Sequence, residues 1–218
     1  QENNRLRRQN LELSDRINVH DNAIRENERL REMLDFRDRN DLAGSVIAAT
    51  VIGHDFDRVV NSLILNRGIR DGVRKNMAVI TAEGLVGRIY ETYFSSSSVL
   101  VLMDAASRVS AVTGNLNGIV RWDGGPYLRM YGLPLTNTPA AGSRVYTTGI
   151  GGVFPPGLFI GTIEGTRATD VERYASVNVQ PAVDFSRVQE VFVVKGSERA
   201  DVWDDNTGTG NFLRPEIQ

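Results

Sequence analysis

The distribution of glycine and proline divides this sequence into two parts. All 21 glycines lie between Gly44 and Gly210, and the first proline is Pro126, so residues 1–43 contain neither. Because glycine and proline terminate helices and form turns, their absence favours one long helix, whereas their later abundance favours short elements joined by turns. The chain is therefore predicted to be a long N-terminal helix followed by a compact, mainly β body.

Residues 1–38 carry a heptad pattern that is typical of a coiled coil. Polar residues within the pattern, such as Asn10 and His20, weaken helix pairing but fix its register. A helix of about 38 residues spans roughly 57 Å, more than a globular body needs, so we expect it to pair with a second copy. A solitary solvated helix and an antiparallel pair are the alternatives. The predicted interface consists of Leu6, Asn10, Leu13, Ile17, His20, Ile24, Asn27 and Leu34.

After Ala43 the pattern changes to period two, with many β-branched residues. Turn signals such as Asn117-Gly118 separate about twelve short segments, which favours small barrels or a sandwich over a parallel α/β sheet. At this chain length we expect two barrels. The expected strands are 45–53, 61–66, 77–81, 85–91, 98–103, 108–113, 118–122, 127–131, 144–148, 158–164, 175–180 and 188–194.

Four segments follow from these patterns. The coiled-coil helix covers 1–38, the first barrel 42–104 and the second barrel 105–195, with the strands of 175–195 able to return to the first barrel. The polar, glycine-containing stretch 196–218 is expected to be a flexible tail.

Composition excludes several classes of function. The net charge is −2 and no basic patch is present, so no electrostatic field draws the chain to nucleic acid. There is no cysteine, which excludes disulfides and thiolate metal sites. The two histidines, His20 and His54, leave little scope for metal binding or acid–base catalysis. We therefore expect no metal and no cofactor.

Each candidate catalytic pattern in the sequence lacks an element that its chemistry requires. His54, Asp104 and Ser143 occur in the order of a chymotrypsin-like triad, but no glycine follows Ser143 to shape an oxyanion hole. The glycine-rich stretch 147–157 is followed by a strand and contains no Gly-Lys-Ser/Thr, so it lacks the helix that a phosphate loop requires. It is predicted to be a turn between strands, in which glycines adopt positive φ values and prolines stiffen the backbone. No catalytic residue is proposed, and the chain is expected not to be an enzyme.

Several motifs resemble those of the MreC family. Residues 66–80 (NRGIRDGVRKNMAVI) are followed by 84–89 (GLVGRI), and 148–158 (TGIGGVFPPGL) resembles the glycine-rich signature of that family. The helix end 26–34 and the stretch 180–185 match as well. The resemblance covers roughly residues 26–194. It departs from the family at Asn76, where glycine is usual, and at Arg67, where lysine is usual.

The resemblance implies a function in bacterial cell shape. MreC proteins are non-catalytic and have one membrane helix, here expected to precede Gln1, then a coiled coil and two β-barrels on the periplasmic or extracellular face of the inner membrane. They form homodimers or higher assemblies. Their implied partners are the elongation transpeptidase (a class B penicillin-binding protein), MreD, RodA, RodZ and MreB.

We interpret the whole as a spacer joined to a docking body. The paired helix would hold the barrels away from the membrane, and the barrels would offer strand edges and stiff glycine turns to partners. Phe154, Leu158 and Phe159 form the candidate partner surface; capping of a barrel end is the alternative role for them. A glycan-binding module is the alternative function, because Trp122, Tyr127 and Tyr131 could stack on sugars, although a core role also suits these rings.

Overall fold

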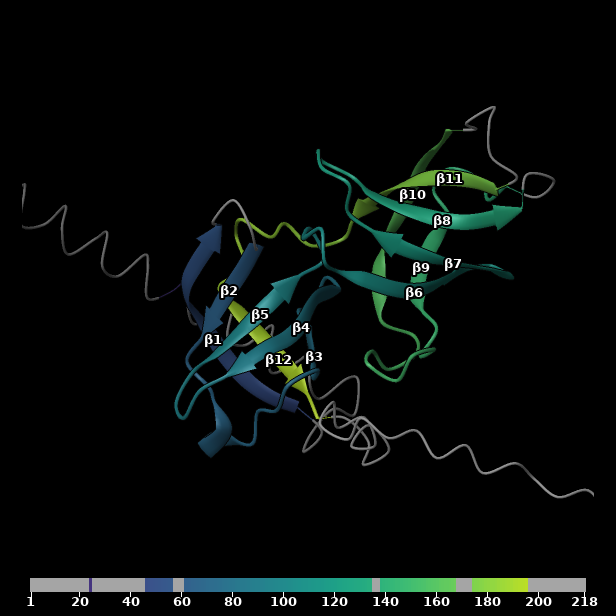
Figure 1. Cartoon of the computed structure of the whole chain (residues 1–218). Coiled ribbons are helices and arrows are strands. Elements are labelled where there is room, and N and C mark those ends of the chain that lie inside the picture. Colours follow the sequence, from purple (N-terminus) through teal and green to yellow (C-terminus); the bar gives the residue numbers. More distant parts are fainter. Residues whose placement is uncertain (1–23, 25–45, 57–60, 135–137, 168–173, 196–218) are drawn as a thin grey trace, which may run out of the picture. The chain divides into compact units, whose positions relative to one another are not determined.

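The computed structural model describes residues 24, 46–56, 61–134, 138–167 and 174–195. From residue 46 onward the described part contains twelve strands and one 3-10 helix (Figure 1). The elements are β1 (Val46–Phe56), β2 (Asn61–Leu65), η1 (Ile69–Asp71), β3 (Ala78–Ile80), β4 (Leu85–Thr92), β5 (Ser97–Val101), β6 (Arg108–Thr113), β7 (Leu116–Arg121), β8 (Leu128–Pro134), β9 (Arg144–Thr147), β10 (Phe159–Arg167), β11 (Tyr174–Pro181) and β12 (Glu190–Val194). No helix in these ranges is long and apolar enough to span a membrane.

Six strands close the first barrel in the order β1-β12-β3-β4-β5-β2, and each neighbouring pair is antiparallel. Alternate side chains point inward, as the period of a strand requires, and fill the barrel with aliphatic groups. The core includes Leu63, Leu65, Ile89, Val99, Val101 and Val193, each almost fully buried.

The second barrel also has six antiparallel strands, in the order β10-β11-β8-β7-β6-β9. Its core includes Val109, Ala111, Val120, Met130, Leu133, Val145, Val177 and Val179. Because β12 lies in the first barrel and β11 in the second, the chain passes from the second barrel back to the first after Pro181.

The predicted fold is confirmed in part. The body is mainly β and forms two barrels, and each of the twelve expected strands overlaps one observed strand. The coiled coil, apart from Ile24, and the tail over 196–218 lie outside the described residues. The expectation that the barrels offer strand edges is wrong for this part of the chain, since closure pairs every described strand on both sides.

Asn76 occupies a position where the backbone turns with a left-handed conformation. Its φ is 68°, a value that asparagine tolerates better than most residues with a side chain. Two contacts hold it there: its N–H donates to the Ile89 carbonyl (2.9 Å), and Arg88 Nη1 donates to its Oδ1 (2.6 Å). The structure thus explains why asparagine can replace the usual glycine at this position.

Candidate functional site

Three exposed apolar side chains of the first barrel lie together where the β4–β5 hairpin meets helix η1. They are Ile69, Tyr93 and Phe94, and we call them the tip cluster. Backbone hydrogen bonds join the two segments, from Ile69 N to Tyr93 O (2.9 Å) and from Arg70 N to Phe94 O (3.1 Å). Phe94 is 73% exposed, so its ring contributes contact area without supporting the core.

Gly68 makes this close approach possible. A Cβ at this position would lie 2.3 Å from the Tyr93 carbonyl oxygen and 2.6 Å from the Ser96 nitrogen. No real Cβ comes so near backbone atoms, so a side chain here would force the two segments apart. Gly72 ends η1 with φ of 86°, a value that favours glycine. The two glycines therefore hold the tip cluster in place.

Asp71 completes the turn electrostatically. The Gly68 N–H donates to Asp71 Oδ2 at 3.0 Å, and this hydrogen bond holds the pKa of the Asp71 carboxyl below its ordinary value. Arg70 Nε lies 3.5 Å from the same oxygen and acts in the same direction. Because the carboxylate both accepts a backbone hydrogen bond and faces a cation, it favours the closed turn in its ionised form.

The hairpin carries one further polar contact. The hydroxyl of Tyr93 donates to Glu91 Oε2 at 2.7 Å, and this bond raises the pKa of Tyr93 above its ordinary value. The hairpin closes through the Tyr93 N–H, which donates to the Ser96 carbonyl at 2.9 Å. The Tyr93 hydroxyl is therefore paired with the Glu91 carboxylate, while the apolar part of the Tyr93 ring stays exposed for contact with a partner.

The glycine-rich turn of the second barrel is built around one buried hydroxyl. Thr147 Oγ1 donates to the Pro155 carbonyl (2.5 Å) and accepts from the Leu158 N–H (2.9 Å). Gly149 and Gly157 have φ values of 81° and 85°, which the reversals of the chain require. The predicted turn between strands is thus present, and hydrogen bonds within it include those from Gly152 N to Gly149 O (3.2 Å) and from Gly157 N to Thr147 O (2.9 Å).

The residues of the predicted partner surface lie in and beside this turn. Phe154 is only 7% exposed and packs inward, whereas Leu158 and Phe159 are half-buried. The Phe159 ring lies 5.4 Å from the ring of Tyr146, its partner across the strands. Their role in binding a partner stays a prediction. Sequence reasoning missed Ile150, which is 67% exposed in the same turn.

A cluster of charged and aromatic side chains lies on the outer face of the second barrel. Arg121 on β7 and Arg129 on β8 are direct cross-strand partners, an arrangement that is unfavourable for like charges. Asp123 offsets it, since its carboxylate lies 2.8 Å from Arg121 Nε and 3.5 Å from Arg129 Nη1. The Tyr131 hydroxyl also donates to Asp123. Arg121 Cζ lies 4.2 Å from the centre of the Tyr131 ring, close enough for a cation–π contact.

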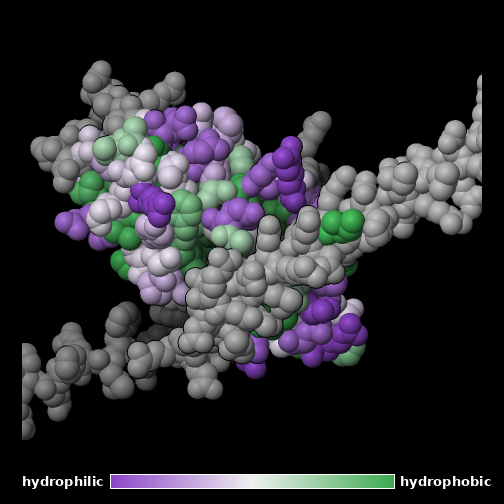
Figure 2. Space-filling view, turned by 180° about the vertical axis from the view of Figure 1, so that it is seen from behind, coloured by the Kyte–Doolittle hydropathy of each residue, from purple (hydrophilic) through white to green (hydrophobic). Residues whose placement is uncertain are grey.

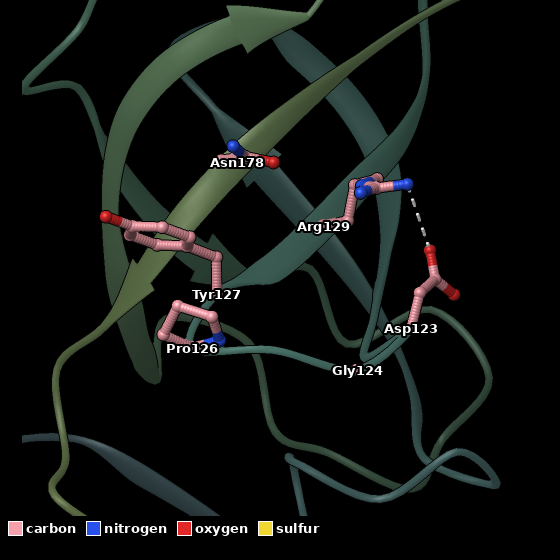
Figure 3. A pocket seen from close by; sticks show the side chains of 6 residues that line it. All are labelled: Asp123, Gly124, Pro126, Tyr127, Arg129 and Asn178. Carbon is pink, nitrogen blue, oxygen red and sulfur yellow. Dashed lines mark ion pairs between the residues drawn. The ribbon is translucent and has the colours of Figure 1, made fainter.

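The three aromatic residues proposed for sugar stacking have different environments. Trp122 donates its indole N–H to the Gly125 carbonyl (2.8 Å) and so clasps the turn between β7 and β8. Tyr131 belongs to the charged cluster. Tyr127 lines a shallow pocket beside that cluster (Figure 3). The three rings therefore make different contacts, and their stacking on sugars stays a prediction.

Other residues considered for chemistry have structural roles. Asp104, which is buried, accepts hydrogen bonds from the N–H groups of Asn61 (2.8 Å) and Ala106 (2.7 Å) and so joins β2 to the segment after β5. No group of three or more potential metal ligands occurs among the described residues. Of the predicted coiled-coil interface, Ile24 is described; it is helical and 44% exposed.

Comparison with known proteins identifies the family. The family model described as "Rod shape-determining protein MreC, barrel core" matches residues 51–195, which is most of the two barrels. The chain belongs to the MreC family. The cell shape-determining protein MreC of Listeria monocytogenes is 34% identical over 194 residues, an alignment that covers 84% of this chain and 64% of that protein. The chain thus spans less than two thirds of the relative's length.

Solved MreC structures share the fold. The MreC structure from Listeria is 28% identical, with a TM-score of 0.65, and the match covers 90% of this chain and 97% of that one. A complex between Penicillin-Binding Protein (PBP2) and MreC from Helicobacter pylori contains a chain of the same fold, with a TM-score of 0.55 and 16% identity. That match covers 69% of this chain and 99% of the other.

The MreC-like motifs of the chain have clear structural roles. The stretch 66–80 forms η1 and the turn beneath the tip cluster, and 148–158 forms the turn around Thr147. In the stretch 84–89, a Cβ at Gly84 would lie 2.6 Å from the Phe159 carbonyl oxygen. Gly84 thus allows the β3–β4 turn to approach β10 closely. The motifs that carry the resemblance are therefore close-approach and turn positions, not a catalytic centre.

Proposed function

We propose that this chain is a non-catalytic scaffold of the bacterial cell-elongation machinery. Its barrels dock enzymes of peptidoglycan synthesis, foremost the elongation transpeptidase, a class B penicillin-binding protein. Membership of a shape-determining family supports this function. The complex of PBP2 with an MreC from Helicobacter pylori supports the choice of partner, since the chain in that complex has the same fold.

The proposal includes an assembly and a location. The chain self-associates through residues 1–38 and acts at the periplasmic or extracellular face of the inner membrane. In the full-length protein a helix that precedes Gln1 anchors it there. MreD, RodA, RodZ and MreB act in the same complex. These parts rest on the motifs shared with the family and on the heptad pattern.

The tip cluster is the observation that carries the docking proposal. Exposed aromatic side chains on a rigid frame contribute strongly to protein interfaces, because their area is buried with little loss of conformational entropy. Phe94 is such a side chain, and Gly68 and the adjoining backbone hydrogen bonds hold its segment in place. Figure 2 shows hydrophobic residues interspersed among hydrophilic ones on the face that it presents, so the barrel surface combines both kinds of contact.

Calorimetric titration tests the docking. The chain is titrated with the exported domain of the class B penicillin-binding protein from the same organism. We expect saturable binding that Phe94→Ser weakens at least tenfold. Ile119→Ser is the control, because it removes an exposed apolar side chain from β7 of the second barrel, outside both predicted docking surfaces. An affinity unchanged by Phe94→Ser but lowered by changes at Leu158 or Phe159 would place the contact on the other predicted surface.

Self-association is tested separately. Removal of residues 1–40 should leave a folded, largely monomeric β body, as measured by analytical ultracentrifugation. A truncated chain that remains dimeric at low concentration would show that the helix is not responsible for pairing. A full chain that does not bind the transpeptidase domain at all would contradict the proposed partner.

A further inference from the structure

A pocket of about 250 Å³ opens on the outer face of the second barrel, beside the charged cluster. It lies between the β7–β8 turn and the neighbouring strand β11 (Figure 3). Its lining residues are Asp123, Gly124, Pro126, Tyr127, Arg129 and Asn178. Sites for drug-sized ligands measure roughly 300–1,000 Å³, so this pocket suits one small ring instead of an extended chain.

The charges beside the pocket are not balanced. Arg121 and Arg129 contribute two positive charges and Asp123 one negative charge, which leaves a net charge of +1. Arg121 holds the shorter contact with the shared carboxylate, 2.8 Å against 3.5 Å. Glu164, the extra residue of the β10 bulge next to Asn178, is exposed and does not line the pocket. A second carboxylate, supplied by a ligand, would complete the pairing of Arg129.

Arg129 is suited to bind such a carboxylate. Its contacts with Asp123 and with the Tyr131 hydroxyl (3.2 Å) both involve Nη1. A guanidinium carries five N–H donors on three nitrogens, so it can hold one carboxylate on Nη1 and offer other donors to a ligand. Figure 3 shows Arg129 between the Asp123 side and the Tyr127 side of the pocket.

The rest of the lining suits a sugar ring. Asn178 lies directly across the strands from Arg129, and its amide can both donate to and accept from hydroxyl groups. On the far side of Asn178 is Gly165, where a Cβ would meet nothing within 4 Å, so no side chain obstructs that approach. Tyr127 and Pro126 supply apolar surface for the C–H face of a ring.

We propose that this pocket binds a carboxylated sugar. The carboxylate pairs with Arg129, the hydroxyl groups meet Asn178 and Asp123, and the ring lies against Tyr127. This proposal extends the glycan-binding alternative and specifies the ligand as an acidic saccharide. It does not depend on docking of the transpeptidase, which we propose for the tip cluster of the first barrel.

Titrations followed by NMR test the proposal. The ¹⁵N-labelled chain is titrated with D-glucuronate, with D-glucose, which lacks the carboxylate, and with acetate, which lacks the ring. We expect saturable shifts of the Asn178 side-chain amide and the Tyr127 backbone with glucuronate. Glucose should bind at least tenfold more weakly, because it loses a charge-assisted hydrogen bond. Acetate should leave Tyr127 unshifted.

Three variants localise the binding. Arg129→Gln removes the cation, and Asn178→Asp places a repelling charge in the pocket with almost no change of shape; each should lower the affinity for glucuronate at least tenfold. Arg187→Gln is the control, since it removes one positive charge from a side chain that is 87% exposed outside the pocket. Absence of saturable shifts, equal binding of glucose or acetate, or unchanged affinity in both pocket variants would each overturn the proposal.

Discussion

Replacement of Gly68 by alanine tests the reasoning about the turn beneath the tip cluster. The φ of Gly68 is −141°, extended backbone that any residue adopts, so the substitution introduces no backbone strain of its own. The cost is steric, because the new Cβ would lie 2.3, 2.6 and 2.8 Å from backbone atoms of Tyr93, Ser96 and Phe94. Those atoms belong to the hairpin backbone and cannot rotate away as a flexible side chain would.

The expected loss of stability depends on whether the hairpin moves or stays in place. Moving the hairpin breaks the hydrogen bonds from Ile69 N and Arg70 N, each worth about 0.5–1.5 kcal/mol net. Keeping the hairpin in place costs about 1–3 kcal/mol of overpacking. The chain takes the cheaper of these two routes, so Gly68→Ala should lower the free energy of unfolding by roughly 1–3 kcal/mol. For a chain of this size that corresponds to on the order of 2–12 °C in Tm.

Urea unfolding followed by far-UV circular dichroism measures the loss, and hydrogen exchange of the Ile69 and Arg70 amides locates it. Gly165→Ala is the matched control, since a Cβ there meets nothing within 4 Å. We expect that variant to leave the free energy of unfolding unchanged or to raise it by about 0.4–1 kcal/mol, because alanine lowers the conformational entropy of the unfolded chain. If Gly68→Ala were as stable as this control, the close approach would not constrain residue 68, and the explanation of the motif would be wrong.

Three further predictions concern other contacts. Thr147→Val should lower the free energy of unfolding by about 1–3 kcal/mol and speed proteolysis of the glycine-rich turn. The reason is that the Pro155 carbonyl and the Leu158 N–H would lose their hydrogen bonds to the Thr147 hydroxyl. Folding lowers the pKa of Asp71, so the ionised carboxylate stabilises the folded chain above the ordinary value of 3.8, and this contribution is lost as the pH falls below it. Asp71→Asn should therefore reduce the fall of the urea midpoint between pH 5 and pH 3. Asp123→Asn leaves Arg121 and Arg129 opposed, and should cost less than about 1 kcal/mol at low salt and nearly nothing in 1 M NaCl.

Local patterns predicted the strands well. Each expected strand is present because period-two alternation acts over a few neighbouring positions. The turn expected at Asn117-Gly118 is wrong, since both residues lie in β7. The glycine-rich turn was also predicted as a turn between strands, and its paired backbone bears this out. The predicted coiled-coil interface stays a prediction.

The surface was predicted less well. Phe154, a residue of the predicted partner surface, is buried, and its role in binding a partner stays a prediction. Phe94 had no distinguishing signal in the sequence, since an aromatic residue in a polar loop can point either way. Exposure depends on which segments pack beside a residue, and for Phe94 that is the distant turn at Gly68.

The sequence by itself determined the mainly β character of the body, the positions of its strands and the absence of cysteine, and it predicts a helical segment before them. These properties depend on residue composition and on the conformational preferences of nearby residues. Tertiary structure alone decided that β12 closes the first barrel while β11 belongs to the second, and that Arg129 and Asn178 face the same pocket. Such pairings depend on the register of strands that are far apart in the chain, and register is selected by the packing of the whole barrel.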